Sequence, residues 1–243
     1  MSADGAAASH AADAGVALIV ALGIERACFE RCAARSAATL SVRQCGPGAG
    51  RAAAAAALAV RGGAAALISC GLAGALRADV EPGCVLLPRS VVGSDGTRFD
   101  VDAGWRERLS QALRARHTVD DRPLLASSEV LATPAAKRQA AQASGAVAVD
   151  MESGAVAAAA MTAGVPFVVL RVAADGAADT LPPGVERWID EAGERRLAPV
   201  VDAALRPGSW PILWTLARRY RRARRTLIEV AGELTPRGFL FHA

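Results

Sequence analysis

The sequence predicts a single three-layer α/β domain, because apolar runs of strand length alternate with helical stretches and no linker-like segment divides the chain. Its 243 residues, of which 52% are hydrophobic and 21% charged, suffice to bury one large core. Much of the hydrophobicity comes from alanine, and no run of about 18 apolar residues occurs. The mean hydropathy of +0.25 therefore does not indicate a membrane-spanning protein.

The elements follow one another along the chain in a regular order. Strands are expected at residues 16–22, 40–44, 64–70, 85–88, 90–92, 123–127, 147–149 and 167–172. Helices are expected at residues 25–34, 50–60, 109–116, 134–143 and 152–163. We expect the strand at 64–70 to end at Gly71 and Gly74. In such a domain ligands bind where strand ends meet loops.

The two ends of the chain differ in character from this body. Residues 1–15 are small and polar and lack the basic start and apolar middle of a signal peptide, which predicts a disordered tail and a cytoplasmic protein. A catalytic domain is expected over 16–205 and a helical extension over 206–243. The five cysteines contain no CxxC pair and indicate buried thiols rather than a metal site or a disulfide; they are Cys28, Cys32, Cys45, Cys70 and Cys84.

The positive charge is concentrated at the C-terminus. From Arg206 onward the chain has eight arginines and two acids, whereas the first 205 residues have 20 basic and 22 acidic residues. A nucleic-acid enzyme carries its basic surface on the folded body, together with aromatic platforms, and only 4% of this chain is aromatic. The composition therefore argues against a nucleic-acid partner.

The C-terminal charges fall on one predicted helix with an apolar stripe. The stripe consists of Leu213, Leu216, Tyr220, Ala223, Leu227, Val230 and Leu234. The positions between hold Arg218, Arg219, Arg221, Arg222, Arg224 and Arg225. Trp210 and Trp214 suit a lipid interface, and arginines attract anionic headgroups by about 1 kcal/mol each. Two interpretations remain open: residues 210–234 bind a membrane surface, or the helix docks on the body or on a partner subunit.

Two common catalytic patterns are missing. The turn at residues 46–50 reads GxGxG rather than GxGxxG, and no acid occurs between Glu30 and Asp79 to hold a ribose, which argues against a dinucleotide site. There is no GxSxG, and the only histidines are His10, His117 and His242. Acid–base chemistry must therefore fall to carboxylates.

Two motifs place carboxylates beside apolar strands. The first is Ala148-Val149-Asp150-Met151-Glu152-Ser153-Gly154-Ala155. The second, Arg171-Val172-Ala173-Ala174-Asp175, follows after one predicted helix and one strand. Together they predict a carboxylate-based site.

These motifs resemble those of a known family. The first resembles the V-[ED]-M-E-[AS] signature of purine nucleoside phosphorylases and nucleosidases, and the second resembles the R-x-x-[ST]-D of the same family. Residues 21–25, 69–74 and 79–88 resemble its water-activating loop, its glycine loop and a further turn and strand. Residues 16–183 are thus similar to the nucleoside phosphorylase and methylthioadenosine nucleosidase superfamily, and more closely to its hopanoid-associated phosphorylase branch, which removes adenine from adenosylhopane. The resemblance implies a three-layer α/β/α fold with a mixed central sheet.

The resemblance also implies roles for the site residues. A purine leaves as an anion unless N7 is protonated, so the site needs an acid beside the base, and Asp175 is the residue expected to supply it. Glu25 is expected to orient water or a ribose hydroxyl, and Glu152 to accept hydrogen bonds from ribose hydroxyls. Met151 is expected to pack against the sugar, and Arg171 to position Asp175 or the glutamates. Asp150 is interpreted as structural.

The glycine loop departs from the family pattern. Its substrate-binding positions are Gly71, Leu72, Ala73 and Gly74, with Leu72 where a hydroxyl residue is usual. Ser69 stands where phosphorolytic members often have an arginine, and Ala174 precedes Asp175 in place of Ser or Thr. Phosphate binding is weakened, although backbone N–H groups of the loop, Arg26 or Arg43 remain candidates to hold it. Hydrolysis and phosphorolysis therefore stay open, with inorganic phosphate as the only co-substrate considered and no metal or other cofactor expected.

Two functions are compatible with these observations. The first is an enzyme of hopanoid biosynthesis that splits adenosylhopane, a lipid-linked nucleoside, into adenine and a ribosyl- or phosphoribosyl-hopane. The second is a soluble purine nucleoside or methylthioadenosine salvage enzyme, or a nucleoside-binding module without turnover. We also expect a homo-oligomer, cytoplasmic or bound peripherally to the inner face of the membrane.

Overall fold

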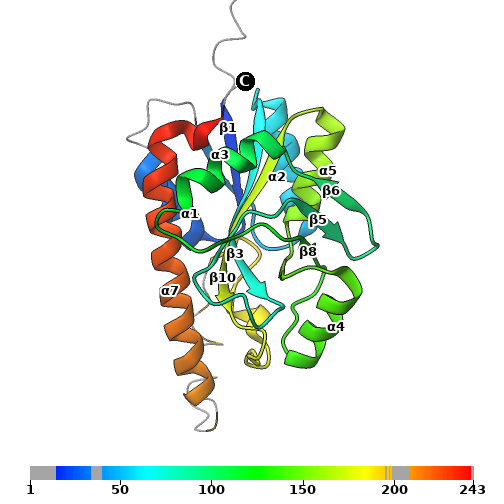
Figure 1. Ribbon diagram of the computed structural model, residues 1–243, viewed down its shortest axis with the longest axis vertical. Helices are drawn as coiled ribbons and strands as arrows, with labels where there is room; N and C mark the ends of the chain where they lie inside the picture. The colour runs from blue at the N-terminus through cyan, green and yellow to red at the C-terminus, as the bar shows by residue number, and fades with distance from the viewer. Residues whose placement is uncertain are drawn as a thin grey trace, which may run out of the picture.

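The computed structural model describes residues 15–33, 40–194, 196, 198, 208 and 210–241 as a sheet covered on both faces by helices (Figure 1). The strands are β1 Val16–Val20, β2 Leu40–Gln44, β3 Ala66–Ala75, β4 Val85–Leu86, β5 Ser90–Gly93, β6 Arg98–Asp100, β7 Val119–Asp120, β8 Leu124–Ala126, β9 Ala148–Asp150 and β10 Phe167–Asp175. The helices are α1 Gly23–Ala33, α2 Ala49–Arg61, α3 Ala103–Leu113, α4 Pro134–Ser144, α5 Ser153–Ala163 and α7 Trp210–Leu234, with short 3₁₀ turns η1 Val185–Trp188 and η3 Thr235–Leu240. The tail expected at 1–15 lies outside the described residues except for Gly15.

The sheet is mixed, as expected, and β3 is at its centre. β3 pairs in parallel with β1 and β10, and its last residues pair antiparallel with β9. β10 pairs antiparallel with β4 on its other side. Because the parallel strands β1, β3 and β10 run in one direction, their carboxyl ends bring residues from distant parts of the chain to the same edge.

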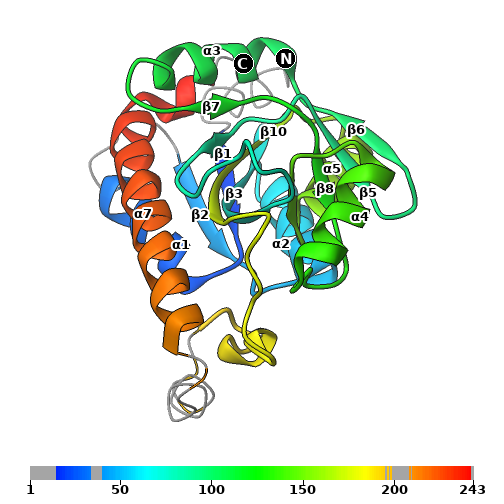
Figure 2. The ribbon, with the colours of Figure 1, turned by 60° about the horizontal axis from the view of Figure 1, so that its bottom comes forward.

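Helices complete three layers, and the fold class predicted from the sequence is confirmed. α1 and α7 pack together on one face of the sheet, and α2 and α5 pack together on the other (Figures 1 and 2). The helix α5 buries Ala157 and Ala160 against the sheet, with no exposed surface on either. Small side chains let the helix approach the sheet closely, which explains how an alanine-rich sequence builds this core.

Two central strands are longer than the sequence predicts. The strand expected to stop at Gly71 continues as β3 to Ala75, and β10 continues to Asp175. The glycine segment keeps the β ladder because its residues pair with those of β10, from Gly71 opposite Arg171 to Gly74 opposite Asp175. The prediction of a glycine loop that ends the strand is therefore wrong.

Smaller differences concern α3 and the short strands. α3 begins at Ala103, earlier than predicted, because the Asp102 side chain caps it by accepting a hydrogen bond from the Trp105 N–H at 2.7 Å. β6 and β7 were not predicted, since strands of two or three largely polar residues carry no period to detect.

The second half of the helix α7 docks on the body of the domain, as one of the two interpretations of the sequence expected. From Ala223 to Leu234 its apolar stripe is buried against the body, chiefly on β10 and α1, with Leu227 2% exposed and Val230 fully buried. Its first half extends past the sheet beside the carboxyl ends of the strands (Figure 1). None of the described helices is long and apolar enough to cross a membrane.

Candidate active site

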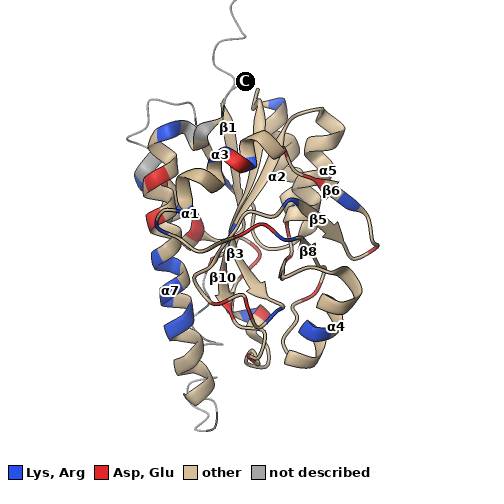
Figure 3. Ribbon diagram, viewed as in Figure 1, with Lys and Arg blue, Asp and Glu red and all other residues tan. Residues whose placement is uncertain are grey.

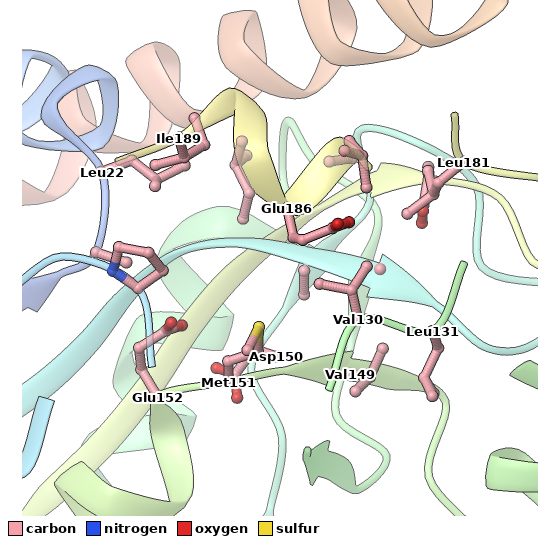
Figure 4. A pocket seen from close by; sticks show the side chains of 18 of the residues that line it. Leu22, Val130, Leu131, Val149, Asp150, Met151, Glu152, Leu181, Glu186 and Ile189 are labelled. Carbon is pink, nitrogen blue, oxygen red and sulfur yellow. The ribbon is translucent and has the colours of Figure 1, made fainter. Parts of the chain in front are cut away.

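The predicted site residues surround one pocket of about 440 Å³ at the carboxyl ends of β1, β3, β9 and β10. Figure 4 shows Glu152 and Met151 on one wall, facing Leu22 and Ile189 across the cavity. This volume lies within the usual range for small-molecule sites, which is about 300–1,000 Å³. Of the predicted site residues, those that line the pocket are Glu25, Leu72, Ala73, Gly74, Met151, Glu152 and Asp175, whereas Arg171 and Gly71 lie beneath its surface.

Arg171 organises the floor of the pocket from β10. It is 1% exposed, and its Nη2 atom lies 2.7 Å from Asp150 Oδ2 and 3.5 Å from Glu152 Oε2. The same nitrogen donates to Ser69 Oγ at 2.7 Å. A buried guanidinium is stable only when paired, and two carboxylates compensate it here. Asp150 also accepts from the Ser153 hydroxyl at the start of α5, which supports the structural role expected for it.

Glu25 lies at the start of α1 and is held by backbone N–H groups. Its Oε2 accepts from the N–H groups of Ala21 and Leu22, at 3.0 and 2.9 Å, and its Oε1 accepts from the Leu72 N–H at 2.8 Å. Burial raises the pKa of Glu25 to about 7, against the opposing effect of Arg171. A carboxylate has about four acceptor sites, so three bonds leave one for a ligand or water.

Gly71 makes room for this arrangement. Its φ of +149° belongs to the region that side chains rarely adopt. An added Cβ would overlap Glu25 Oε1 and lie 2.7 Å from Arg171 Nη1. The glycine is therefore required so that the acid and the guanidinium can both approach β3.

Glu152 connects the site to the glycine turn before α2. Its Oε1 accepts from the Gly48 N–H at 2.9 Å, where the positive φ of +106° again suits glycine. Burial raises the pKa of Glu152, and the charge of Arg171 opposes the shift. Met151 is half-buried beside it on the pocket wall. The turn that was excluded as a dinucleotide site thus serves to orient the expected ribose-binding glutamate.

Asp175 ends β10 and makes two charged or polar contacts. Its Oδ1 accepts from the Ala75 N–H at 3.0 Å, and its Oδ2 accepts from Lys137 Nζ at 2.9 Å. Burial raises the pKa of Asp175, while the positive charge of Lys137 lowers it. A carboxyl group whose pKa is raised retains a proton more readily, which is the state that a proton donor needs.

Lys137 and the outer wall were missed by reasoning from the sequence. Lys137 comes from α4, a helix that no motif connected to the site. The outer wall consists of apolar side chains from the loop around η1 and from α7, together with Glu129 and Glu186. Its apolar members are Leu181, Val185, Ile189 and Leu216.

The two arginines expected as phosphate ligands are not at the pocket. Arg26 is exposed and pairs with Glu30 at 3.7 Å, and the Arg43 guanidinium lies near Gly62 at the far end of α2. The Leu72 N–H is already donated to Glu25. Neither arginine lines the pocket, and among the described lining residues Lys137 is the only cation. Phosphate binding by the remaining N–H groups of the glycine segment stays a prediction. The described residues also contain no cluster of three or more His, Cys, Asp or Glu arranged to hold a metal ion.

Comparison with solved structures identifies the same class of fold. S-adenosylhomocysteine nucleosidase from Streptococcus pyogenes, in complex with 5-methylthiotubericidin, matches with a TM-score of 0.66 and 20% identity over 92% of this chain and 98% of its own. The 5'-methylthioadenosine/S-adenosylhomocysteine nucleosidase from Helicobacter pylori matches with a TM-score of 0.68 and 14% identity, over 90% and 98%. Futalosine hydrolase from Helicobacter pylori gives 0.68 and 14%, over 91% and 99%. At these identities the likeness shows the fold.

The family follows from the sequence match. The model of the phosphorylase superfamily matches residues 25–206, well over half of the chain. The chain therefore belongs to the phosphorylase superfamily. A comparison with curated proteins finds no match.

Proposed function

We propose that this chain hydrolyses the N-glycosidic bond of a purine nucleoside that carries a large apolar 5′ substituent, and that adenosylhopane is its substrate. The observation that carries the proposal is the convergence of Asp175, Glu152 and Glu25 in one pocket. It supplies an acid for the leaving base, an acceptor for ribose hydroxyls and a base for water. The nucleosidases with the same fold act on related nucleosides, as their names state.

The reaction places opposite demands on the two ends of the pocket. Asp175 donates a proton to N7, so that the purine leaves as a neutral base rather than as an anion. Glu25, with a pKa of about 7, accepts the proton of the water that attacks the ribose. Glu152 accepts hydrogen bonds from ribose hydroxyls and so fixes the sugar between the two acids.

Water is favoured over phosphate as the nucleophile. A phosphate co-substrate needs cations or unpaired N–H donors at the sugar, and the only cation among the described lining residues is already paired with Asp175. Apolar side chains at the outer wall, such as Ile189 and Leu216, support a substituent without charge. These features support hydrolysis of a lipid-linked nucleoside.

The experiment compares products with and without phosphate. Purified protein is incubated with adenosylhopane and, separately, with adenosine, and the products are identified by mass. We expect adenine and a ribosyl-hopane in both buffers, with adenosine cleaved more slowly. Asp175→Asn should reduce kcat by roughly 10²-fold or more in a folded protein. A phosphoribosyl product that requires phosphate would contradict hydrolysis, and equal rates on the two nucleosides would contradict the lipid substrate.

Access to a lipid-linked substrate requires contact with a membrane, and we place that contact on the outer face of α7. Positions three or four residues apart on a helix share a face, so Trp214 lies in one row with Arg218, Arg221 and Arg225. Trp214 is 66% exposed, and the side chain of Arg218 lies 5.4 Å from its ring. This row is opposite to the buried stripe of Ala223 and Leu227 onward. The face of α7 proposed to bind the membrane thus differs from the apolar stripe that the sequence suggested for that role.

The charges of this row are available to a partner. Arg219 and Arg222 turn towards the body and pair with Asp179 and Glu81. No described acid pairs with Arg218, Arg221 or Arg225, and α7 carries no acid before Glu229. Figure 3 shows the run of basic residues along the middle of α7. Exposed tryptophan beside unpaired arginines fits an anionic lipid surface.

Vesicle binding tests this surface with a charge-matched control. We expect the full-length protein to bind phosphatidylcholine vesicles containing phosphatidylglycerol and to release as salt screens the charge. Replacing Arg218, Arg221 and Arg225 by glutamine should weaken binding on the order of 100-fold, since each headgroup contact contributes roughly fivefold. The control replaces three exposed arginines of α2, β6 and α4 by glutamine: Arg61, Arg98 and Arg138. Equal loss in the control would mean that only net charge matters, and the assignment to α7 would be wrong.

A further inference from the structure

Lys137 is the only lysine of the chain, and the other 27 basic residues of the Lys and Arg count are arginines. It lies on α4, is 1% exposed and lines the pocket. Its ammonium group donates to Asp175 Oδ2 at 2.9 Å and to the Gly176 carbonyl oxygen at 2.9 Å. A buried ammonium is unfavourable without such partners, so its position is determined by the acid that it contacts.

The carboxyl group of Asp175 is fixed from two sides. Lys137 holds one oxygen, and the Ala75 N–H holds the other at 3.0 Å. Gly74 leaves space for it, because a Cβ there would lie 3.2 Å from Asp175 Oδ1. Two donors on two oxygens set the plane of the carboxyl group, which a single donor would leave free to rotate.

We infer that Lys137 is the positioning residue for the proton donor: it orients the Asp175 carboxyl group and stabilises the carboxylate that remains after the proton moves to the leaving purine. This inference rests on the proposed function and deepens it. In the step itself the Asp175 O–H bond breaks, an N–H bond forms on the purine, and the electrons of the C–N bond pass to the base. Water adds to the ribose carbon and gives its proton to Glu25. The new negative charge on Asp175 then lies 2.9 Å from the ammonium group.

A lysine suits this position better than an arginine. The acid must be strong enough to protonate the base, and its burial alone would make it too weak. A compact ammonium next to one oxygen opposes the effect of burial without occupying both oxygens, as the planar fork of an arginine does. This explains why the single lysine of the chain lies at this contact.

The test compares Lys137→Met with Arg138→Met, its exposed neighbour on α4. Two substrates are used: adenosine, and a purine riboside with electron-withdrawing ring substituents, whose base leaves more readily without a proton. Lys137→Met should lower kcat on adenosine by roughly 10–100-fold, with a loss on the activated riboside about tenfold smaller. It should also move the alkaline limb of the pH profile upward, because the pKa of Asp175 rises when the cation is removed. Arg138→Met should leave both rates and the profile unchanged.

Equal losses on both substrates, with an unmoved pH profile, would show that Lys137 only supports the structure. Lys137→Ala provides a second variant, because added ethylammonium should restore cleavage of adenosine in a concentration-dependent manner. If neither Lys137 variant folds, a comparison that keeps Lys137 still tests the contact. With lysine labelled at ¹³Cε, the tag-free chain gives one side-chain signal, and Asp175→Asn should shift it; an unchanged signal would overturn the pairing. A wild-type protein that releases no purine contradicts the proposed function instead.

Discussion

Replacing Glu25 by glutamine tests the electrostatics of the pocket through stability as well as activity. In the folded protein burial raises the pKa of Glu25 from 4.5 to about 7. A group with a raised folded pKa contributes stability that is fully present below the unfolded pKa and is lost as the pH rises through the folded pKa. At about 1.4 kcal/mol per pH unit, the wild type therefore loses about 3 kcal/mol from this group between pH 4.5 and 7.

Glutamine has no charge to bury, and its cost does not depend on pH. In the wild type the N–H groups of Ala21, Leu22 and Leu72 donate to both oxygens of Glu25. The amide of glutamine has only one oxygen, so at least one of these donors loses its acceptor. An unpaired buried donor costs about 1–3 kcal/mol at every pH. Glu25→Gln should thus be less stable than the wild type at acidic pH, and the difference should shrink or reverse by pH 8.

Urea unfolding of both proteins at intervals from pH 5 to 8 measures this change. The buried acids Asp175 and Glu152 titrate in both proteins, so their contributions largely cancel in the difference. Glu30→Gln, an exposed change on the same helix, should give a difference that does not vary with pH. If the stability difference for Glu25→Gln is equally constant, the carboxyl group is not desolvated and the reasoning fails.

Activity should show the same titration. Because Glu25 must be ionised to accept a proton from water, kcat/KM of the wild type should show an acidic limb that rises with pH towards about 7. The glutamine variant should lose this limb along with most of its rate. An unaltered acidic limb would assign the titration to another group.

Three further predictions follow from the geometry. Glu152→Gln should lose more activity on ribosides than on 2′-deoxyribosides, as measured by kcat/KM for matched pairs, because the missing hydroxyl cannot use the contact; equal losses would make this residue structural. Gly71→Ala should lower the melting temperature by several degrees and abolish turnover, whereas Gly50→Ala, with open space in α2, should be neutral or stabilising. Leu58 of α2 and Met161 of α5, which are 53% and 61% exposed, are predicted to contact a second copy of the chain, so that changing both to glutamate should reduce the mass in sedimentation equilibrium.

The motifs predicted the site because each one is a short piece of strand that ends in a carboxylate. Asp150 ends β9, Glu152 follows it, and Asp175 ends β10. The two strand ends meet because β9 and β10 both pair with the last residues of β3, Val149 and Asp175 each opposite Gly74. What the motifs did not contain is the backbone geometry at Gly71. Gly71 pairs with Arg171 of β10, 100 residues further along the chain, and no local period in the sequence encodes that pairing.

The outer wall could not be predicted for a related reason. Leu181, Val185 and Ile189 come from the loop around η1, and Leu216 comes from the far end of the chain. Apolar residues in a loop and on a helix are most simply interpreted as core, because periodicity does not distinguish a side chain that faces the interior from one that faces a ligand. Only the assembled fold shows that these residues meet across a cavity.

Lys137 is different, because a signal for it was present in the sequence. Of the 28 Lys and Arg residues in the sequence, only Lys137 is a lysine. Arginine and lysine differ in shape, hydration and the ease with which burial alters their protonation, so a single exception to a uniform choice indicates a position where the ammonium itself matters. Thr133 caps α4 and Pro134 is its first residue, so these two residues fix where the helix starts. From the first turns of this helix the ammonium group of Lys137 reaches Asp175, 38 residues further along the chain. The feature that separates this site from an ordinary carboxylate cluster is thus a residue type, which motifs defined by spacing do not contain.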